Sequence, residues 1–320
     1  MSLLPLRVKQ NATRETGLGR HKSKKRGPES YHSAPHPILV IRHALRYAQF
    51  PTGRQPHHIA RAPQSSKNTQ MPATPAWPPR SAPRLFVPGP LADGGEVALD
   101  GNQAHYLLRV MRLGEGDAVV LCDDATGEWA AEVIDMGKRD VVLGVVSNLR
   151  GREDVPDFWL CPALLKKDRF DMVLEKASEL GVRRIQPVLT RRCVADRLNE
   201  DRARTILVEA AEQCARTALP ELAPVLKLDA LLSDWPDDRT LFFADETGGE
   251  PAAGAFAAHS GPAALVTGPE GGFDDAERAA IRERPQARAI SLGPRILRGE
   301  TAAIAACALW MGIAGDWNSN

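Results

Sequence analysis

The pattern of hydrophobic and polar residues changes character along the chain. From residue 84 to about residue 149, short alternating segments are separated by Gly and Asp, which is typical of antiparallel strands joined by tight turns. The pattern predicts strands at 118–122, 129–134 and 140–146, hairpin turns at 124–127 and 137–140, and a helical turn at 105–112. We therefore expect this region to form a small β-barrel.

From residue 158 onward, apolar strands alternate with helical segments, an order that favours a largely parallel sheet. We expect strands at 158–165, 185–189, 240–244, 263–267 and 289–292, and a long helix near 200–217. One further helix has an apolar stripe at helical spacing that ends at Gly181, formed by Phe170, Val173, Leu174, Ala177 and Leu180. Residues 301–314 are apolar almost all round, which predicts a buried helix.

Two loops rich in Gly and Pro follow apolar strands in this second region. The first is Thr267-Gly-Pro-Glu-Gly-Gly-Phe273, and the second is Leu292-Gly-Pro-Arg-Ile-Leu-Arg298. Glycine lets the main chain approach a ligand closely, and Pro269 stiffens the first loop. Either loop alone is equally compatible with a simple strand-to-helix bend. The pair indicates one ligand held by backbone from both loops.

The residues after the first loop predict the start of a helix. Asp274 is a suitable N-cap, and Glu277 three residues later completes the spacing of a capping box. The chain has no Gly-Lys-Ser/Thr ending to a phosphate-binding loop and no Gly-x-Gly-x-x-Gly fingerprint after an early strand. An ordinary Rossmann nucleotide site is therefore disfavoured.

Composition is that of a globular protein of about two domains, with 43% hydrophobic and 25% charged residues. No apolar run is long enough to span a bilayer. The five cysteines are scattered without a Cys-x-x-Cys pair, so we expect reduced packing residues of a cytoplasmic protein and no metal site.

The net charge of +1 conceals an uneven distribution. Residues 1–80 hold 14 Lys or Arg against two acidic residues, whereas residues 81–320 hold 27 against 38. The basic segment lacks a core-forming pattern, so we expect a disordered extension that a miscalled start has added, and a chain that begins at Met71 should fold and act normally. A transit peptide and an electrostatic contact with nucleic acid are the alternatives.

Several motifs together resemble the 16S rRNA (uracil(1498)-N(3))-methyltransferase family of the SPOUT class. They are the two glycine loops, Lys166-Lys-Asp-Arg-Phe-Asp171, Glu175-Lys-Ala-Ser-Glu-Leu-Gly181 and Glu209-Ala-Ala-Glu-Gln-Cys-Ala-Arg216. The resemblance covers residues 81–320. Cys193 and Gly299 depart from the family's pattern, and neither is expected to affect activity.

The resemblance implies an α/β fold with a PUA-like, RNA-binding β-barrel at residues 81–150 and a trefoil-knotted, parallel-sheet SPOUT domain at residues 155–320. It implies a homodimer that methylates N3 of one uridine in 16S ribosomal RNA, within the small ribosomal subunit, as a transferase of class 2.1.1. S-adenosyl-L-methionine is the implied methyl donor. The donor would be held by Thr267, Gly268, Pro269, Glu270, Gly271, Gly272, Leu292, Gly293, Ile296 and Leu297.

The acceptor nitrogen must lose a proton before or as it attacks the methyl group. We expect Arg298 to stabilise the developing uracil anion and Glu300 to take the proton, although Glu300 is equally suited to complement the dipole of the following helix. The identity of the base therefore stays open. Methylation at nitrogen needs no cysteine nucleophile.

Contacts with RNA are expected from basic residues on both domains, namely Arg109, Arg112, Lys166, Arg169 and Arg192. Each of them is also compatible with a solvated or carboxylate-paired surface position. Two other classes of protein stay open: a SPOUT enzyme acting on another RNA site, and a catalytically silent RNA-binding module. The paired glycine loops argue against the silent module.

Overall fold

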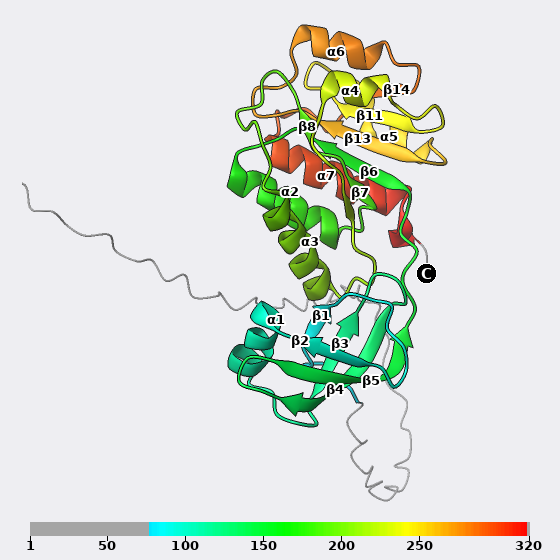
Figure 1. Ribbon diagram of the computed structural model, residues 1–320. Helices are drawn as coiled ribbons and strands as arrows, with labels where there is room; N and C mark the ends of the chain where they lie inside the picture. The colour runs from blue at the N-terminus through cyan, green and yellow to red at the C-terminus, as the bar shows by residue number, and fades with distance from the viewer. Residues whose placement is uncertain (1–76, 319–320) are drawn as a thin grey trace, which may run out of the picture. The chain divides into compact units, whose positions relative to one another are not determined.

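The computed structural model describes residues 77–318 (Figure 1). These residues lie within one compact unit of the chain, and the description below concerns them. Almost all of the basic segment lies outside the described residues, so its expected roles stay predictions. Among the helices of residues 77–318, none combines the length and the apolar character needed to cross a membrane.

The first sheet has five strands in the order β1-β3-β4-β5-β2, and its bounds are β1 (Arg84–Phe86), β2 (Glu96–Leu99), β3 (Ala118–Cys122), β4 (Glu128–Met136) and β5 (Val141–Arg150). The pair β1 and β3 is parallel, and the others are antiparallel. All five strands contribute to one apolar core. Helix α1 (Gly101–His105) continues into a π-helical turn, Tyr106–Met111. The predicted strands, hairpins and helical turn of this region are confirmed.

The turn between β3 and β4 is organised by the carboxylate of Asp123. Its oxygens accept hydrogen bonds from the backbone of Leu91 at 2.7 Å and from the hydroxyl of Thr126 at 2.6 Å, as well as from the turn's own backbone N–H groups. Burial by itself would raise the pKa of Asp123, but these donors lower it to about 2. The charged form is therefore the one that the fold stabilises.

Replacing Asp123 with asparagine should destabilise the protein by about 2 kcal/mol at pH 7, since a pKa lowered from 3.8 to about 2 is worth roughly that much. A lowered pKa contributes stability above the unfolded-state value, and this contribution is lost as pH falls through the folded-state value. Denaturant unfolding should show the difference shrinking between about pH 4 and pH 2. Asp93→Asn, at an exposed position, is the control, and a pH-independent difference would contradict this assignment.

The second sheet has seven parallel strands, which confirms the predicted parallel-sheet domain. In their order across the sheet, they are β12 (Glu250–Pro251), β14 (Ala287–Ser291), β11 (Thr240–Ala244), β13 (Ala263–Thr267), β6 (Phe158–Pro162), β7 (Arg184–Ile185) and β9 (Glu221–Leu222). The helices of this domain are α2 (Lys167–Glu179), α3 (Glu200–Cys214), α4 (Leu228–Ser233), α5 (Ala252–Ala257), α6 (Asp275–Arg282) and α7 (Gly299–Ile313), followed by a 3-10 turn, Asp316–Asn318.

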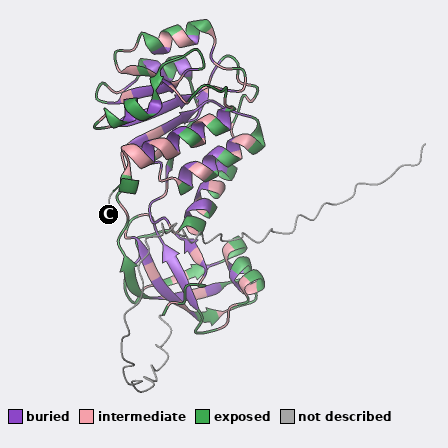
Figure 2. Cartoon of the chain, turned by 180° about the vertical axis from the view of Figure 1, so that it is seen from behind, coloured by how far each residue is buried: buried purple, intermediate pink, exposed green. Residues whose placement is uncertain are grey.

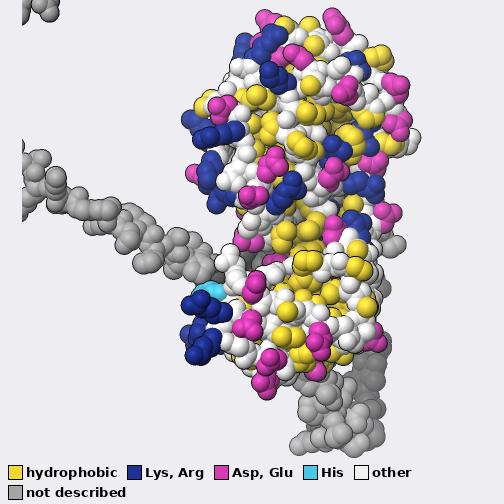
Figure 3. Space-filling view, viewed as in Figure 1, with side chains coloured by type: hydrophobic (Ala, Val, Ile, Leu, Met, Phe, Trp, Pro, Cys, Tyr) yellow, Lys and Arg dark blue, Asp and Glu magenta, His cyan; other side chains and the backbone are white. Residues whose placement is uncertain are grey.

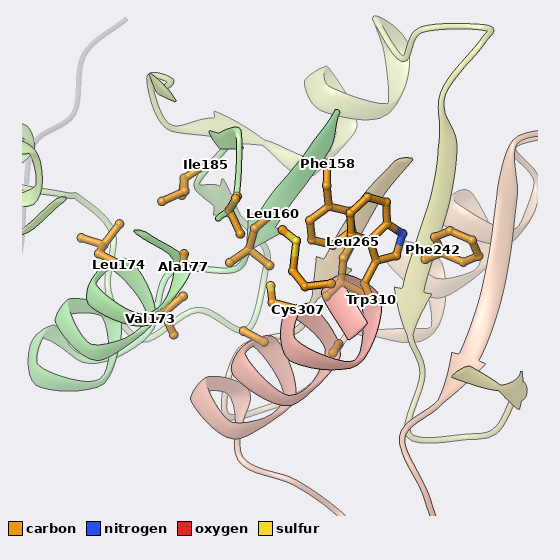
Figure 4. Close-up of a cluster of buried hydrophobic side chains, with 14 of the residues drawn as sticks. Phe158, Leu160, Val173, Leu174, Ala177, Ile185, Phe242, Leu265, Cys307 and Trp310 are labelled. Carbon is orange, nitrogen blue, oxygen red and sulfur yellow. The ribbon is translucent and has the colours of Figure 1, made fainter. Parts of the chain in front are cut away.

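Alternation along the central strands sends side chains to two separate cores. On β11, Phe242 joins the core that includes α2, α3, α5 and α7, while Leu241 and Phe243 join the core under α4 and α6. Figure 4 shows the first core, in which the rings of Phe158 and Trp310 stack with centroids 4.2 Å apart. Figure 2 shows the strands largely buried and the helices with both buried and exposed residues. The stripe predicted for α2 lies in this first core.

One predicted strand was wrong. The segment 185–189 is not continuous: β7 belongs to the seven-stranded sheet, whereas β8 (Val188–Leu189) pairs with β10 (Leu226–Lys227) in a separate two-stranded sheet. Pro187 lies at the break, and a proline has no N–H to donate to the ladder. The other predicted strands are confirmed within a few residues, and the helix predicted at 200–217 ends at Cys214 because Ala215 is left-handed, with φ of 62°. The trefoil knot stays a prediction.

Candidate active site

The two glycine loops meet in one cavity of about 430 Å³. They leave the carboxyl ends of β13 and β14, which flank β11 in a parallel sheet, so the ends of all three strands lie at the same edge. Thr267, also predicted to contact the donor, is the buried last residue of β13 and does not belong to the cavity wall. Of the ten predicted cofactor residues, the nine that line the cavity are Gly268, Pro269, Glu270, Gly271, Gly272, Leu292, Gly293, Ile296 and Leu297.

A third loop, which follows β11, completes the cavity and was missed in the sequence. Ala244, Asp245, Glu246 and Gly248 line it. The available signal was an apolar strand followed by Asp-Glu-Thr-Gly-Gly, the same strand-to-glycine arrangement as in the other two loops. Only the strand order shows that this loop lies between them.

Arginines of α6 hold the third loop in place. Arg278 donates to Asp245 at 3.0 Å and to Glu246 at 2.7 Å, and Arg282 donates to Asp245 at 2.6 Å. Burial would raise the pKa of Asp245, but hydrogen bonds from Arg282, Thr247 and Arg278 lower it overall. The charged form of Asp245 is thus the one that these donors stabilise.

At two points of the site, a glycine leaves room for a close neighbour. Gly272 has a φ of +66°, and a Cβ there would lie 2.5 Å from Oε1 of Glu246. A Cβ on Gly299 would lie 2.8 Å from Leu165 Cδ2 and 3.1 Å from the carbonyl oxygen of Gly268. Gly299, which departs from the family's pattern, therefore packs tightly against Leu165 and the first loop.

The first loop is also held from outside the cavity. Asp274 and Glu277 form the predicted capping box at the start of α6, which is confirmed. The backbone N–H of Arg191 donates to Glu277 at 2.7 Å, and the side chain of Arg192 donates to the carbonyl of Gly271 at 3.1 Å. The segment around residue 191 thus braces the loop and the helix that follows it.

Arg298 and Glu300, the predicted catalytic residues, lie where α7 begins. Arg298 is exposed and is the N-cap of the helix, between the cavity-lining residues Leu297 and Gly299. Glu300 is only 8% exposed, in the first turn of α7, and one of its oxygens lies 3.7 Å from Nε of Arg169. This position suits dipole complementation, and Glu300 does not line the cavity, so its role in proton transfer stays a prediction.

The basic residues predicted to contact RNA fall in two groups. Arg109 and Arg112 are exposed on and just after the π-helical turn, and Figure 3 shows Lys and Arg side chains gathered beside α1. Lys166, Arg169 and Arg192 all contact the first glycine loop: the backbone N–H of Lys166 donates to Glu270 at 3.2 Å, and Arg169 lies 3.5 Å from the same carboxylate. This second group therefore lies against the first glycine loop, whose residues line the cavity.

The cysteines lie away from the cavity wall. Burial raises the pKa of Cys122 and of Cys161 to about 12, which leaves both as unreactive thiols at neutral pH. Cys307 is also buried, whereas Cys193 is half-buried and Cys214 is exposed, so the expectation of packing residues fails for Cys214. Within residues 77–318, His, Cys, Asp and Glu side chains form no cluster suited to a metal ion.

Comparisons with known proteins show to which class of protein this fold and this site belong. Residues 153–311 match the model of an RNA methyltransferase domain, and residues 99–146 match an RNA methyltransferase PUA domain. A relative from Synechocystis, named Ribosomal RNA small subunit methyltransferase E, is 34% identical over 66% of this chain and 71% of its own length. A relative of the same name from Rickettsia conorii is 28% identical over 70% of this chain and 93% of its own. The chain belongs to the Ribosomal RNA small subunit methyltransferase E family.

Solved structures agree with this assignment. The Ribosomal RNA small subunit methyltransferase E of Neisseria gonorrhoeae, bound to S-adenosyl methionine, superimposes with a TM-score of 0.69 at 28% identity. The match covers 74% of this chain and 100% of that one. The expected α/β architecture, with a PUA domain before a parallel-sheet methyltransferase domain, is therefore confirmed.

Proposed function

We propose that this protein transfers the methyl group of S-adenosyl-L-methionine to N3 of one uridine in 16S ribosomal RNA. The observation that carries the proposal is a cavity that three strand-end loops form together, in a chain of this family. A SPOUT enzyme acting on another RNA site is the alternative. A catalytically silent RNA-binding module would not need a cavity that binds a methyl donor.

The residues of the cavity suit the methyl donor. Gly268, Gly271 and Gly272 let the main chain reach a flat adenine, while Leu292 and Leu297 offer short apolar surface. The bound donor supplies an activated methyl group on a sulfonium. The chain has to hold it against the acceptor in line, and such positioning is by itself a large part of catalysis.

The acceptor nitrogen needs proton removal and charge stabilisation. Arg298, exposed at the start of α7, is suited to stabilise negative charge that develops on the uracil. Glu300, two residues later, is the candidate to take the N3 proton. Neither role requires a cysteine, in keeping with the location of the thiols outside the cavity wall.

The RNA contacts that we propose use exposed basic side chains of both domains. Arg109 and Arg112, in the PUA domain, would bind RNA phosphates, and Lys166 and Arg192 would bind them beside the first glycine loop. Basic groups beside this loop would place the target nucleotide close to the donor even though residues 81–320 are acidic overall.

The test is to map methylated nucleotides in small-subunit RNA treated with the protein. Naked 16S RNA and assembled small subunits lacking the modification should be compared in the presence of S-adenosyl-L-methionine. We expect one uridine that carries a methyl group at N3. A modified base or ribose elsewhere would select the alternative enzyme, and donor binding without any methylation of either substrate would contradict the proposal.

We also expect a homodimer formed through α7. Several apolar residues of this helix are only half-buried in the single chain, among them Ile304, Leu309 and Ile313, and Trp317 just beyond it is 55% exposed. Such a surface gains stability by pairing with a second copy. Light scattering at micromolar concentration should give the mass of a dimer, and Leu309→Glu should shift it toward the monomer. A strictly monomeric mass in an active preparation would contradict this prediction.

A further inference from the structure

Three charged side chains from three different elements meet behind the first glycine loop. Arg169 comes from α2, Glu270 from the loop itself and Glu300 from α7. The guanidinium of Arg169 lies 3.5 Å from Oε1 of Glu270 and 3.7 Å from Oε1 of Glu300. One cation therefore faces two carboxylates, a group that we call the Arg169 cluster.

Each carboxylate of the Arg169 cluster has one oxygen without a hydrogen-bond partner among the described residues. These oxygens, Oε2 of Glu270 and Oε2 of Glu300, are both shielded from solvent. Glu300 as a whole is only 8% exposed. An unpaired buried carboxylate oxygen is costly, so a site of this kind is poised to receive positive charge.

The third loop, which lies between the two glycine loops, pairs its carboxylates with more donors. There, Asp245 accepts from both Arg278 and Arg282, and Glu246 accepts from Arg278, which also lies 3.3 Å from the exposed Asp275. The Arg169 cluster has one cation for two carboxylates and so lacks one positive charge. Because Glu270 lines the cavity, this excess negative charge lies next to it.

We propose that the Arg169 cluster makes the cavity selective for the methyl donor over its demethylated product, by attraction between its excess negative charge and the sulfonium of the donor. The inference rests on the proposed function. S-adenosylmethionine carries a positive charge on sulfur, whereas S-adenosylhomocysteine has a neutral thioether and is otherwise nearly the same in shape. A charge shielded from water acts strongly on a neighbouring charge, so this single difference is enough to separate the two ligands.

This proposal gives Arg169 a different role from the RNA contact expected of it. Its guanidinium positions two carboxylates that belong to different segments, and its side chain is 33% exposed. The positive charge of Arg169 also offsets part of the repulsion between the two carboxylates. Arg169 is therefore a positioning residue of the donor site, and Glu270 is the residue that carries selectivity to the cavity wall.

Calorimetry on the full chain with each ligand separately tests the proposal. In Glu270→Gln, which keeps the size of the side chain and removes its charge, the Kd for S-adenosylmethionine should rise about tenfold, while the Kd for S-adenosylhomocysteine should change less than about twofold. Glu270→Asp, which keeps the charge, should retain most of the preference. The matched control is Glu283→Gln, an exposed carboxylate at the C-terminal end of α6 that does not line the cavity, which should alter neither affinity.

The outcomes separate this inference from the proposed function. If Glu270→Gln weakens the binding of both ligands equally, Glu270 is a structural residue and the proposed selectivity is overturned. If neither affinity changes, the proposed selectivity is also overturned. If Glu270→Gln does not fold, Glu300→Gln takes its place, with the same expected loss of preference. A wild-type chain that binds the donor but methylates no RNA would contradict the proposed function alone, whereas one that binds no donor would overturn both.

Discussion

Replacing Arg298 with alanine should lower methylation by roughly 100-fold or more while donor affinity stays within a few-fold of the wild-type value. The side chain is exposed at the N-cap of α7 and lies outside the cavity wall that Leu297 and Gly299 form beside it. Its removal therefore leaves the donor site intact and deletes a positive charge that we place near the uracil anion. Arg298→Lys should recover only part of the activity, because a point charge does not reproduce a planar fork of donors.

The measurement for Arg298 is single-turnover methylation beside calorimetric binding of the donor. Arg288→Ala serves as the control, since Arg288 is an exposed arginine of β14 that does not line the cavity. Equal losses of affinity and of rate in Arg298→Ala would make Arg298 a residue of the donor site or of the fold. Unchanged methylation would remove it from the mechanism.

Replacing Gly272 with alanine should weaken donor binding about tenfold or more. Gly272 has a φ of +66°, in which an L side chain is strained, and the added Cβ would lie 2.5 Å from Oε1 of Glu246. Strain of this kind costs on the order of 1–3 kcal/mol, and relief of the contact requires either the first loop or the carboxylate of Glu246, which accepts from Arg278 at 2.7 Å, to move. Since both loops line the cavity, their displacement should appear directly as a rise in the Kd of S-adenosylmethionine.

Gly94→Ala is the matched control for this second substitution. Gly94 has a nearly equal φ of +70° but nothing within 4 Å of an added Cβ. It should lose some stability through backbone strain alone and keep its donor affinity. Comparable affinity losses in the two variants would show that the close contact with Glu246 does not shape the site.

Much of the local structure could be predicted because it depends on neighbours in the sequence. The capping box of Asp274 and Glu277 joins residues three positions apart, and the apolar stripe of α2 needs only helical periodicity. The strand predicted at 185–189 was wrong because the apolar residues on either side of Pro187 resemble one strand, although they belong to strands of two different sheets. Apolar character predicts burial, whereas the choice of pairing partner depends on residues far along the chain.

For the site, too, some parts could be predicted from the sequence and others could not. The sequence by itself determined the two glycine loops, the helix starts beside them and, through the resemblance of its motifs, the family, since each of these depends on residue type and short spacing. Only the tertiary structure showed that the loop after β11 completes the cavity, and that Arg169 lies between Glu270 and Glu300. The physical reason is that parallel strand order and charge pairing join segments separated by up to 131 positions, from Arg169 to Glu300, and no local pattern records such contacts.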